Sequence, residues 1–217
     1  MTADLKIDFV SDVSCPWCAI GLASLEQALQ RLRGEVRPQL RFQPFELNPA
    51  MPPGGQEIGE HLTAKYGSTA EQQAASREAI RLRGAEVGFV FRKEGRGRVY
   101  NTFNAHRLLH WAGLEGAERQ HALKKALLKA YFTDGLSPEA PDVLVQAAAD
   151  AGLDPIRARQ ILGTDEYAKE VRGEERHFQD LGIHAVPSVV VNDRHLIQGG
   201  QPPEVFEQAL RQIASGG

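Results

Sequence analysis

The only two cysteines of the chain stand close together, in the run Cys15-Pro16-Trp17-Cys18. Where such a pair opens a helix, the free backbone N–H groups and the helix dipole stabilise a thiolate, which is the nucleophilic form of cysteine. A second cysteine one turn further on can then resolve the mixed disulfide that the first one forms. The spacing therefore predicts a redox-active dithiol, with Cys15 as the attacking thiol and Cys18 as the more buried resolving thiol of higher pKa.

Two other interpretations of the cysteines are a zinc half-site and a pair of inert buried thiols. A zinc site needs about four ligands, and the nearest histidine in the sequence is His61. His106 and His110 stand at i and i+4 and would suit a shared metal, but we expect them to line the seam between the core and an insertion. We therefore expect no metal and no tightly bound cofactor.

The residues before the cysteines alternate between apolar and polar, as in a strand, and those after them repeat with a helical period. Pro16 fits the first turn of that helix because its missing N–H has no helical partner there. The helix ends before Gly34, and a second strand around Leu40 and Phe42 completes a β-α-β unit. The apolar positions of the first strand and the helix are Leu5, Ile7, Phe9, Leu22, Leu25, Leu29 and Leu32.

The middle of the chain is different, because between Glu57 and Asp180 it shows helical periods and almost no strand pattern. Glycines punctuate most of these segments, as helix C-caps do. Further on, a β-branched run, a polar turn and a second apolar run predict two strands over 189–197, and 203–213 predicts a closing helix. The expected helices of the middle are Glu57–Tyr66, Thr69–Val87, Thr102–Leu114, Ala117–Phe132, Pro141–Ala151, Asp154–Leu162 and Glu166–Leu181.

This order of elements predicts an α/β thioredoxin-like fold, β-α-β followed by β-β-α, with a large all-α helical insertion between the two halves. We place the first half of the core at residues 1–56, the insertion at 57–165 and the second half at 166–217. A chain of 217 residues, 42% of them hydrophobic, is long enough to bury such a core.

The composition argues against several classes of partner. The formal net charge is −3, from 25 basic and 28 acidic residues mixed along the chain, so we expect neither a nucleic acid nor a membrane surface as a partner. No apolar run approaches the roughly 18 residues of a membrane span, and the first residues show no secretory signal. We therefore expect a cytoplasmic protein.

Short segments spread over nearly the whole chain match a known pattern in the expected order. They are Asp8-Phe9, Cys15–Cys18, Phe42–Pro49, Asn101-Thr102, Ala105–Leu108, Val186–Ser188 and Gly200–Pro202. With these segments the chain resembles the DsbA-like thioredoxin superfamily and, within it, the cytosolic FrnE-like branch. The resemblance implies that Pro187 follows a cis peptide bond and faces the dithiol. Some relatives in this branch carry a second cysteine pair, and its absence here excludes an electron relay to a second internal disulfide.

Pro16, Trp17, Val186 and Pro187 are expected to support the dithiol. A proline at the start of an edge strand is the ordinary interpretation of Pro187, whereas the resemblance places it in front of the thiols. There it offers no N–H, and the backbone of Val186 can pair with an extended substrate segment. Trp17 is either a core aromatic or, as its place at a helix start favours, a partly exposed platform for a substrate.

Four further residues are candidates for contact with a substrate, namely Asn101, Thr102, His106 and His184. For the first two the simpler interpretation is capping of the helix that follows, and for His184 it is a histidine at a strand edge. Either Asp8 or Asp12 would suit a proton relay for Cys18, and the sequence does not distinguish them. One basic cluster is most simply interpreted as a solvated loop. The alternative is a site for a glutathione carboxylate or another anionic substrate. The cluster consists of Arg92, Lys93, Arg96 and Arg98.

We predict from these features a thiol-disulfide oxidoreductase that exchanges disulfides with protein or small-molecule thiols, with glutathione as a candidate co-substrate. The direction of exchange depends on the reduction potential relative to the compartment, which the sequence does not give. One alternative is a glutathione-dependent isomerase or transferase of the kappa or hydroxychromene carboxylate isomerase type, whose members carry serine where Cys15 stands. Another is a holdase-like binding module without catalysis. An apolar face on an insertion helix would support a homodimer if it is exposed, or it would equally form the core of the insertion.

Overall fold

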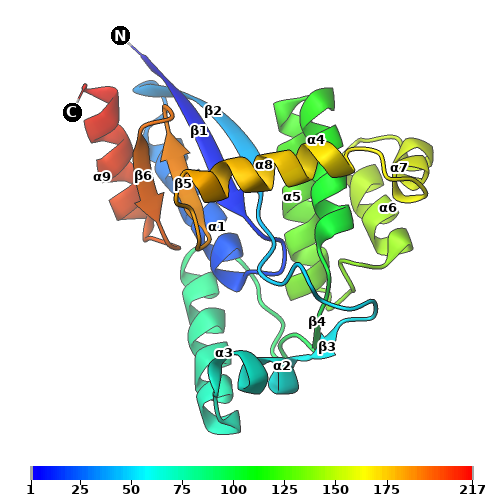
Figure 1. Ribbon diagram of the computed structural model, residues 1–217. Helices are drawn as coiled ribbons and strands as arrows, with labels where there is room; N and C mark the ends of the chain where they lie inside the picture. The colour runs from blue at the N-terminus through cyan, green and yellow to red at the C-terminus, as the bar shows by residue number, and fades with distance from the viewer. Residues whose placement is uncertain (1, 217) are drawn as a thin grey trace.

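Strand β1 (Ala3–Ser11) lies at the centre of the fold, in a computed structural model that describes residues 2–216 (Figure 1). It pairs in parallel with β2 (Val36–Pro44) and antiparallel with β5 (Ser188–Val191). β6 (His195–Gln198) pairs with β5 and completes a four-stranded mixed sheet in the order β2-β1-β5-β6. The predicted thioredoxin-like arrangement of β-α-β followed by β-β-α is confirmed.

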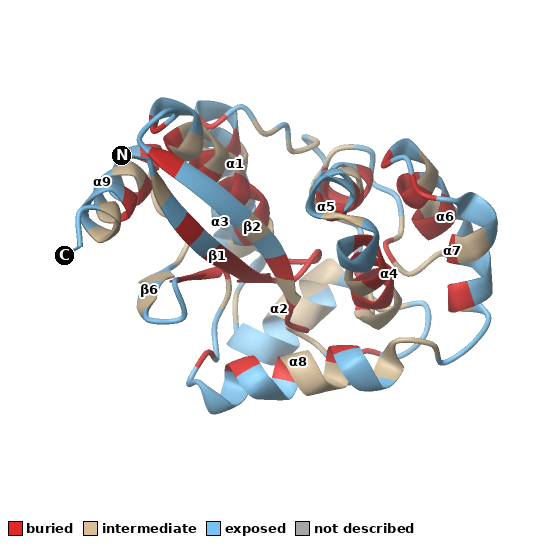
Figure 2. Cartoon of the chain, turned by 90° about the horizontal axis from the view of Figure 1, so that it is seen from above, coloured by how far each residue is buried: buried red, intermediate tan, exposed pale blue. Residues whose placement is uncertain are grey.

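Helices cover both faces of this sheet, as the two views in Figures 1 and 2 show. α1 (Pro16–Arg31) and α9 (Pro203–Ala214) pack together on one face, and α8 (Ala168–Asp180) crosses the other. The last five residues of β1 are therefore all buried, as expected for a strand that is covered on both sides. Phe9 and Phe206 are among the largest fully buried side chains of the resulting core.

Six helices separate β2 from α8 in the sequence, and all of them begin and end within two residues of the predicted positions. The small differences come from residues that cap a helix without belonging to it, such as Thr69, which forms a capping box with Gln72. None of the helices in residues 2–216 is long and apolar enough to cross a membrane. The six helices are α2 (Ile58–Tyr66), α3 (Ala70–Glu86), α4 (Phe103–Glu115), α5 (Ala117–Phe132), α6 (Pro141–Asp150) and α7 (Pro155–Leu162).

The expectation of almost no strand in this middle region was wrong at one place. β3 (Gln56–Glu57) and β4 (Arg98–Val99) form a two-stranded antiparallel sheet. Strands of two residues are too short to leave an alternating pattern in the sequence. Gly55 makes the close approach possible, since a Cβ there would lie 2.1 Å from the carbonyl oxygen of Val99. The proposed boundaries of the insertion stay a prediction.

A glutamine on α5 ties the helical region to the outer edge of the sheet. Gln120 accepts a hydrogen bond from the backbone N–H of Phe42 and donates one to its carbonyl oxygen, both at 3.0 Å. Its amide thus replaces a neighbouring strand at the free edge of β2, where an unpaired backbone would otherwise be exposed. α5 is held against β2 in this way, and the side chains on that face of α5 point toward the core.

Candidate active site

The dithiol stands at the start of α1, where the chain leaves β1. Cys15 is the N-cap of the helix and Pro16 its first residue, as predicted. The N–H of Cys15 donates to the carbonyl of Asp12 at 3.3 Å, and the N–H of Cys18 donates to the carbonyl of Cys15 at 3.1 Å. Both cysteines are free thiols, with Cys15 4% and Cys18 0% exposed. The attacking and resolving roles assigned to them stay a prediction.

The surroundings of the two thiols move their pKa values in opposite directions. A hydrogen bond from the thiol of Cys18, helped by the backbone N–H groups of Cys18 and Trp17, lowers the pKa of Cys15 against the opposing effects of burial and the Asp12 carboxylate. Burial raises the pKa of Cys18 well above its ordinary value, and the neighbouring Cys15 raises it further. Of the two thiols, Cys15 is therefore the one that loses its proton first.

The segment before β5 lies against the first turn of α1. The peptide bond between Val186 and Pro187 is cis, and the thiol of Cys15 donates to the carbonyl of Val186 at 3.7 Å. Two glycines make this packing possible. A Cβ on Gly21 would lie 3.0 Å from Cγ of Pro187, and a Cβ on Gly200 would lie 3.0 Å from the carbonyl oxygen of Trp17. The Val-Pro segment and the later Gly200 are thus brought to the dithiol by close backbone contacts.

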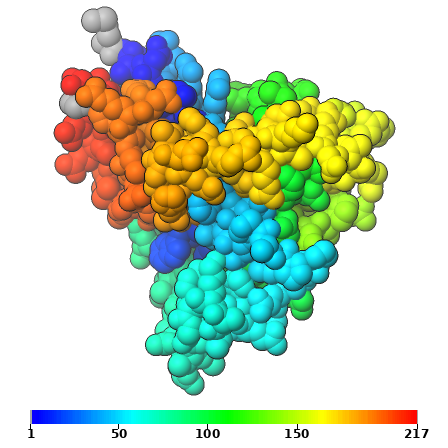
Figure 3. All heavy atoms as spheres, viewed as in Figure 1, coloured from blue at the N-terminus to red at the C-terminus, as the bar shows by residue number. Residues whose placement is uncertain are grey.

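Beside Cys15 the surface is hollowed into a cleft of about 480 Å³, a size common for small-molecule sites. Trp17 is 42% exposed at its edge, so the predicted partial exposure of this side chain is confirmed. The far wall comes from α2 and α3, which form the cyan lobe that projects from the lower end of the molecule in Figure 3. The apolar part of the lining includes Leu47, Ile58, Leu62, Ile80, Phe91 and Val99.

The charged side chains that line the cleft are all basic. Lys65 comes from α2, Arg77 from α3, and Arg92 and Arg96 from the loop before β4, whereas no aspartate or glutamate lines the cleft in the described part of the chain. Within residues 2–216, Lys65 and Arg96 bond to neutral oxygens only, and Arg92 has the exposed Glu94 as its partner. The cleft therefore presents unneutralised positive charge to whatever enters it.

The solvated-loop interpretation of the basic cluster holds only in part. Lys93 is exposed and outside the cleft, whereas Arg96 reaches inward and donates to the carbonyl oxygen of Ser14 at 2.8 Å. Its guanidinium lies 5.9 Å and 5.7 Å from the ring centroids of Tyr131 and Phe132. Arg98 donates to backbone carbonyls beside β3 and does not line the cleft. The sequence alone did not separate these residues because the difference lies in what packs against each of them.

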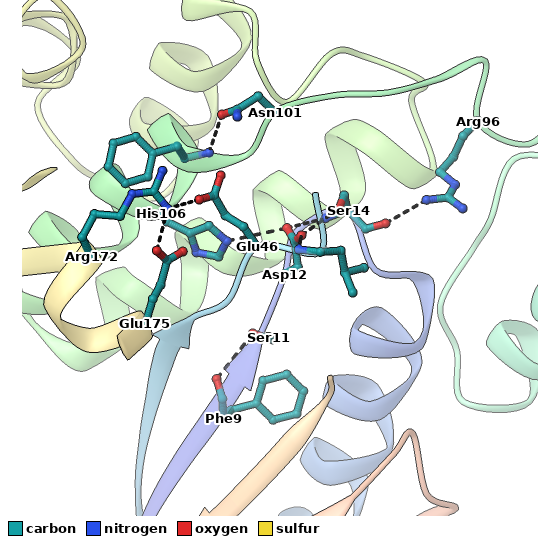
Figure 4. Close-up of polar contacts among 12 residues, drawn as sticks. Phe9, Ser11, Asp12, Ser14, Glu46, Arg96, Asn101, His106, Arg172 and Glu175 are labelled. Atoms are coloured by element: carbon teal, nitrogen blue, oxygen red, sulfur yellow. Dashed lines mark hydrogen bonds and ion pairs between the residues drawn. The ribbon is translucent and has the colours of Figure 1, made fainter. Parts of the chain in front are cut away.

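Of the two aspartates considered as proton relays, Asp12 is the one beside the dithiol, since its backbone carbonyl accepts the N–H of Cys15. Figure 4 shows its carboxylate between Ser14 and His106. It accepts hydrogen bonds from the N–H and hydroxyl of Ser14 at 3.0 and 2.9 Å and from the N–H of Leu47 at 2.7 Å, and it lies 3.6 Å from Nε2 of His106. Asp8 instead accepts from the side chain of Gln43 at 2.6 Å.

The pKa of Asp12 follows from these contacts. Burial alone would raise it, but the neighbouring imidazole of His106 and the N–H groups of Leu47 and Ser14 lower the pKa to about 2. Asp12 is therefore a fixed buried anion at neutral pH. A carboxylate with so low a pKa is a weak base, so Asp12 is a poor acceptor for the proton of Cys18.

The four predicted substrate contacts do not line the cleft. Asn101 accepts from the N–H of Phe103 at 2.9 Å and so caps α4, whereas the side chain of Thr102 makes no capping hydrogen bond. His106 is buried against Asp12, in the expected seam between α4 and the core, and His184 is exposed. The predicted contact of these four residues with a substrate in the cleft is therefore not supported by their positions.

A second buried polar group lies next to His106 (Figure 4). Arg172 on α8 bridges the carboxylates of Glu46 and Glu175. The other histidine of the i and i+4 pair, His110, bonds to Glu174 on α8 at 3.0 Å and so does not share a metal with His106. Among residues 2–216 no three ligand side chains are grouped to hold a metal ion.

Lys124 on α5 is among the charged residues of the interior that sequence reasoning missed. Its side chain is completely buried. The signal was present in the helical period, because Lys124 stands one turn after Gln120 and one turn before Leu128, on the buried stripe of α5. A lysine inside an apolar stripe is unusual enough to be singled out.

Comparison with known proteins agrees with this geometry. A family model for the DSBA-like thioredoxin domain matches residues 6–211. The structure of a probable DsbA oxidoreductase from Streptomyces coelicolor is 36% identical and covers 98% of this chain and 90% of that one, with a TM-score of 0.90. YwbO of Bacillus subtilis (strain 168) is 26% identical over 97% of this chain and 96% of its own length.

A more distant solved structure shares the fold alone. The cytosolic disulfide reductase DsbM from Pseudomonas aeruginosa, in a structure with GSH, is 16% identical and covers 97% of this chain and 99% of its own, with a TM-score of 0.64. None of these likenesses is specific to the FrnE-like branch, which stays a prediction. The match of the family model over nearly the whole chain shows that the protein belongs to the DSBA-like thioredoxin domain family.

Proposed function

We propose that the protein is a thiol-disulfide oxidoreductase in which Cys15 and Cys18 form the working couple. The observation that carries the proposal is the pair of free thiols at the start of α1, with the pKa of Cys15 lowered and that of Cys18 raised. Membership of the DSBA-like family and the likeness to a probable DsbA oxidoreductase support it. The opposite pKa directions give the two thiols different tasks.

The reaction follows from those tasks. The Cys15 thiolate attacks one sulfur of a substrate disulfide, and a mixed disulfide forms as the first substrate thiolate leaves. Cys18 loses its proton and attacks the sulfur of Cys15, so that the second substrate thiolate leaves and an internal disulfide forms. The protein has then given two electrons to the substrate. With an oxidised protein and a substrate thiol the same steps run backward.

The cleft favours a small anionic thiol or disulfide as the exchange partner. Four basic side chains, little neutralised, surround a hollow that reaches Cys15. Apolar residues form the rest of the wall, which suits the body of a short peptide. Glutathione, a tripeptide thiol with two carboxylates, has this chemistry. We include it in the proposal as co-substrate, with the cytoplasm as the compartment.

The first experiment measures the reduction potential of the couple. The protein is equilibrated in glutathione buffers of defined ratio, and free thiols are counted by quantitative alkylation. A reversible two-electron transition between about −120 and −270 mV would place it among working exchange proteins. If Cys15 and Cys18 never form a disulfide in that range, the proposal fails.

A second experiment tests the anionic substrate. Arg96→Met should lower the rate constant for oxidised glutathione by about tenfold, the effect expected for loss of one charged hydrogen bond. The rate with the neutral hydroxyethyl disulfide should change much less, which controls for the lost contact between Arg96 and Ser14. Lys93→Met is the matched control, because Lys93 is a basic residue of the same loop outside the cleft. Equal effects on both disulfides would refute the role of the basic cleft.

The alternative functions predict different results for cysteine variants of the protein. A glutathione-dependent isomerase would keep its activity in Cys15→Ser, since members of that type carry serine there. A holdase-like module would still protect unfolded proteins after both cysteines are replaced. A thiol-disulfide oxidoreductase loses exchange in Cys15→Ser and stalls at the mixed disulfide in Cys18→Ser.

A further inference from the structure

Lys124 is a fully buried lysine that takes no part in the contacts described for the exchange reaction. Its side chain is 0% exposed, and among residues 2–216 its Nζ has no hydrogen-bond partner. An ammonium group in such a place is costly, because burial removes its hydration without a compensating hydrogen bond. Burial accordingly lowers the pKa of Lys124. Buried lysines of this kind are suited to act as bases.

Lys124 stands on the face of α5 that packs against the apolar cluster containing the dithiol. One turn earlier, Gln120 holds the backbone of Phe42, and one turn later Leu128 packs in the same apolar cluster as both cysteines. Nζ of Lys124 lies 6.0 Å from the centroid of the Phe42 ring, which belongs to that cluster too. The amine is therefore buried beside the same cluster as the two thiols.

The ionisable groups that face Lys124 are few. The charges that act on it are those of Cys18, Asp12 and Cys15, in that order. Asp12 is in turn held by His106 from α4. The next residue on the helix, Lys125, points elsewhere and pairs with Glu26 on α1 at 3.0 Å.

Lys124 and Cys18 form a complementary acid and base. Burial raises the pKa of the thiol and lowers that of the amine, so each is biased toward its neutral form. The positive charge of Lys124 in turn favours the Cys18 thiolate. Transfer of one proton between them creates an ion pair inside the cluster without exposing either group to water.

Resting on the proposed function, we propose that Lys124 is the base that takes the proton of Cys18 in the resolving step. In the mixed disulfide the thiol of Cys18 gives its proton to the neutral amine of Lys124. The Cys18 thiolate then attacks the sulfur of Cys15, the bond between Cys15 and the substrate sulfur breaks, and the substrate leaves as a thiolate. The ammonium of Lys124 afterwards returns its proton to solvent. In the reverse direction Lys124 protonates Cys18 as the internal disulfide opens.

The test separates the two steps in a single turnover. Reduced protein is mixed with one equivalent of dithiobis-nitrobenzoate, a chromogenic disulfide that releases one coloured thiolate in each step. The first, bimolecular release reports Cys15, and the second, unimolecular release reports Cys18. Lys124→Met should slow the second release by about a hundredfold or more and remove a titration from its pH profile, while the first release stays within about twofold. Lys125→Met, which removes a charge from the next position of the same helix, should leave both releases unchanged.

Two further variants make the outcome decisive. Lys124→Arg keeps the positive charge but cannot give up its proton, so the second release should stay slow. Lys124→Gln guards against a methionine variant that does not fold, and it should behave like Lys124→Met. Recovery of the rate in Lys124→Arg, or a second release in the Met and Gln variants equal to that in Lys125→Met, would overturn the inference. Absence of the first release in the wild-type protein would instead overturn the proposed function.

Discussion

Replacement of Asp12 by asparagine probes the buried anion beneath the dithiol. The carboxylate accepts three hydrogen bonds, from Ser14 and Leu47, and faces His106. Together they lower the pKa of Asp12 from 3.8 to about 2 in spite of burial. That difference corresponds to about 2.5 kcal/mol of stability for the folded protein at neutral pH. Asparagine cannot carry the charge, and its amide N–H groups would face donors, so Asp12→Asn should lose at least this amount.

The effect has a defined dependence on pH. Because the pKa of Asp12 is lower in the folded than in the unfolded chain, its contribution is fully present well above pH 4 and is lost as the pH falls from about 3.8 through about 2. At pH 3 about half of it, roughly 1.3 kcal/mol, should remain. The gap in free energy of unfolding between wild type and Asp12→Asn should therefore narrow by about 1 kcal/mol between pH 7 and pH 3.

Urea unfolding at the two pH values measures this gap. The control is Asp142→Asn, which removes an exposed carboxylate paired with Arg159 and should cost less than about 0.5 kcal/mol at either pH. An Asp12→Asn protein as stable as this control at pH 7, or a gap that does not narrow at pH 3, would refute the reasoning.

The same variant has a second readout at the thiol. The charge of Asp12 raises the pKa of Cys15, so its removal should lower that pKa. Alkylation by iodoacetamide, followed as a function of pH, should show the reactive Cys15 thiolate at lower pH in Asp12→Asn than in the wild type. A shift in the opposite direction would mean that the variant disturbs the start of α1 rather than its electrostatics.

Two other predictions concern the contacts that hold the site in place. Gln120→Ala leaves the buried N–H and carbonyl of Phe42 unpaired and should lower the free energy of unfolding in urea by about 2–4 kcal/mol, whereas Gln146→Ala on an exposed helix face should cost less than about 0.5 kcal/mol. Gly200→Ala places a Cβ 3.0 Å from the carbonyl of Trp17 and should cost about 1–3 kcal/mol in thermal or urea unfolding. Gly173→Ala on α8 should instead raise the free energy of unfolding by up to about 1 kcal/mol, because a Cβ there meets no atom within 4 Å and alanine favours a helix.

The features that the sequence predicted well are those with local causes. The start of α1 at Cys15 and Pro16 follows from the N-cap and first-turn preferences of the chain itself. The helix ends follow from caps and glycines, such as Gly67, which has the left-handed conformation after α2. The β-branched run before the polar turn at Asn192 gives β5 in the same way. In each case the residues that decide the structure lie within a few positions of it.

The features that escaped prediction depend on contacts between distant segments. β3 and β4 pair across 40 residues and are too short for a pattern. The basic cleft combines Lys65, Arg77 and Arg96 from three separate elements, and nothing in the spacing of these residues indicates that they meet. That Asp12, and not Asp8, lies beside His106 likewise depends on which face of the sheet α4 approaches.

The dithiol belongs to the thioredoxin-like core, and the helical region places a basic residue on each side of it. Solvent reaches one of these two residues and not the other. Arg96 lines an open cleft, where water and salt screen its effect on a substrate. Lys124 is enclosed with the thiols, where a charge acts more strongly and salt does not reach it. Removal of Arg96 should therefore weaken the bimolecular step in a salt-dependent way, and removal of Lys124 should slow the unimolecular step equally at low and high salt. A salt-dependent unimolecular step would mean that the proton of Cys18 is taken up from the side of the cleft, and not by the enclosed Lys124.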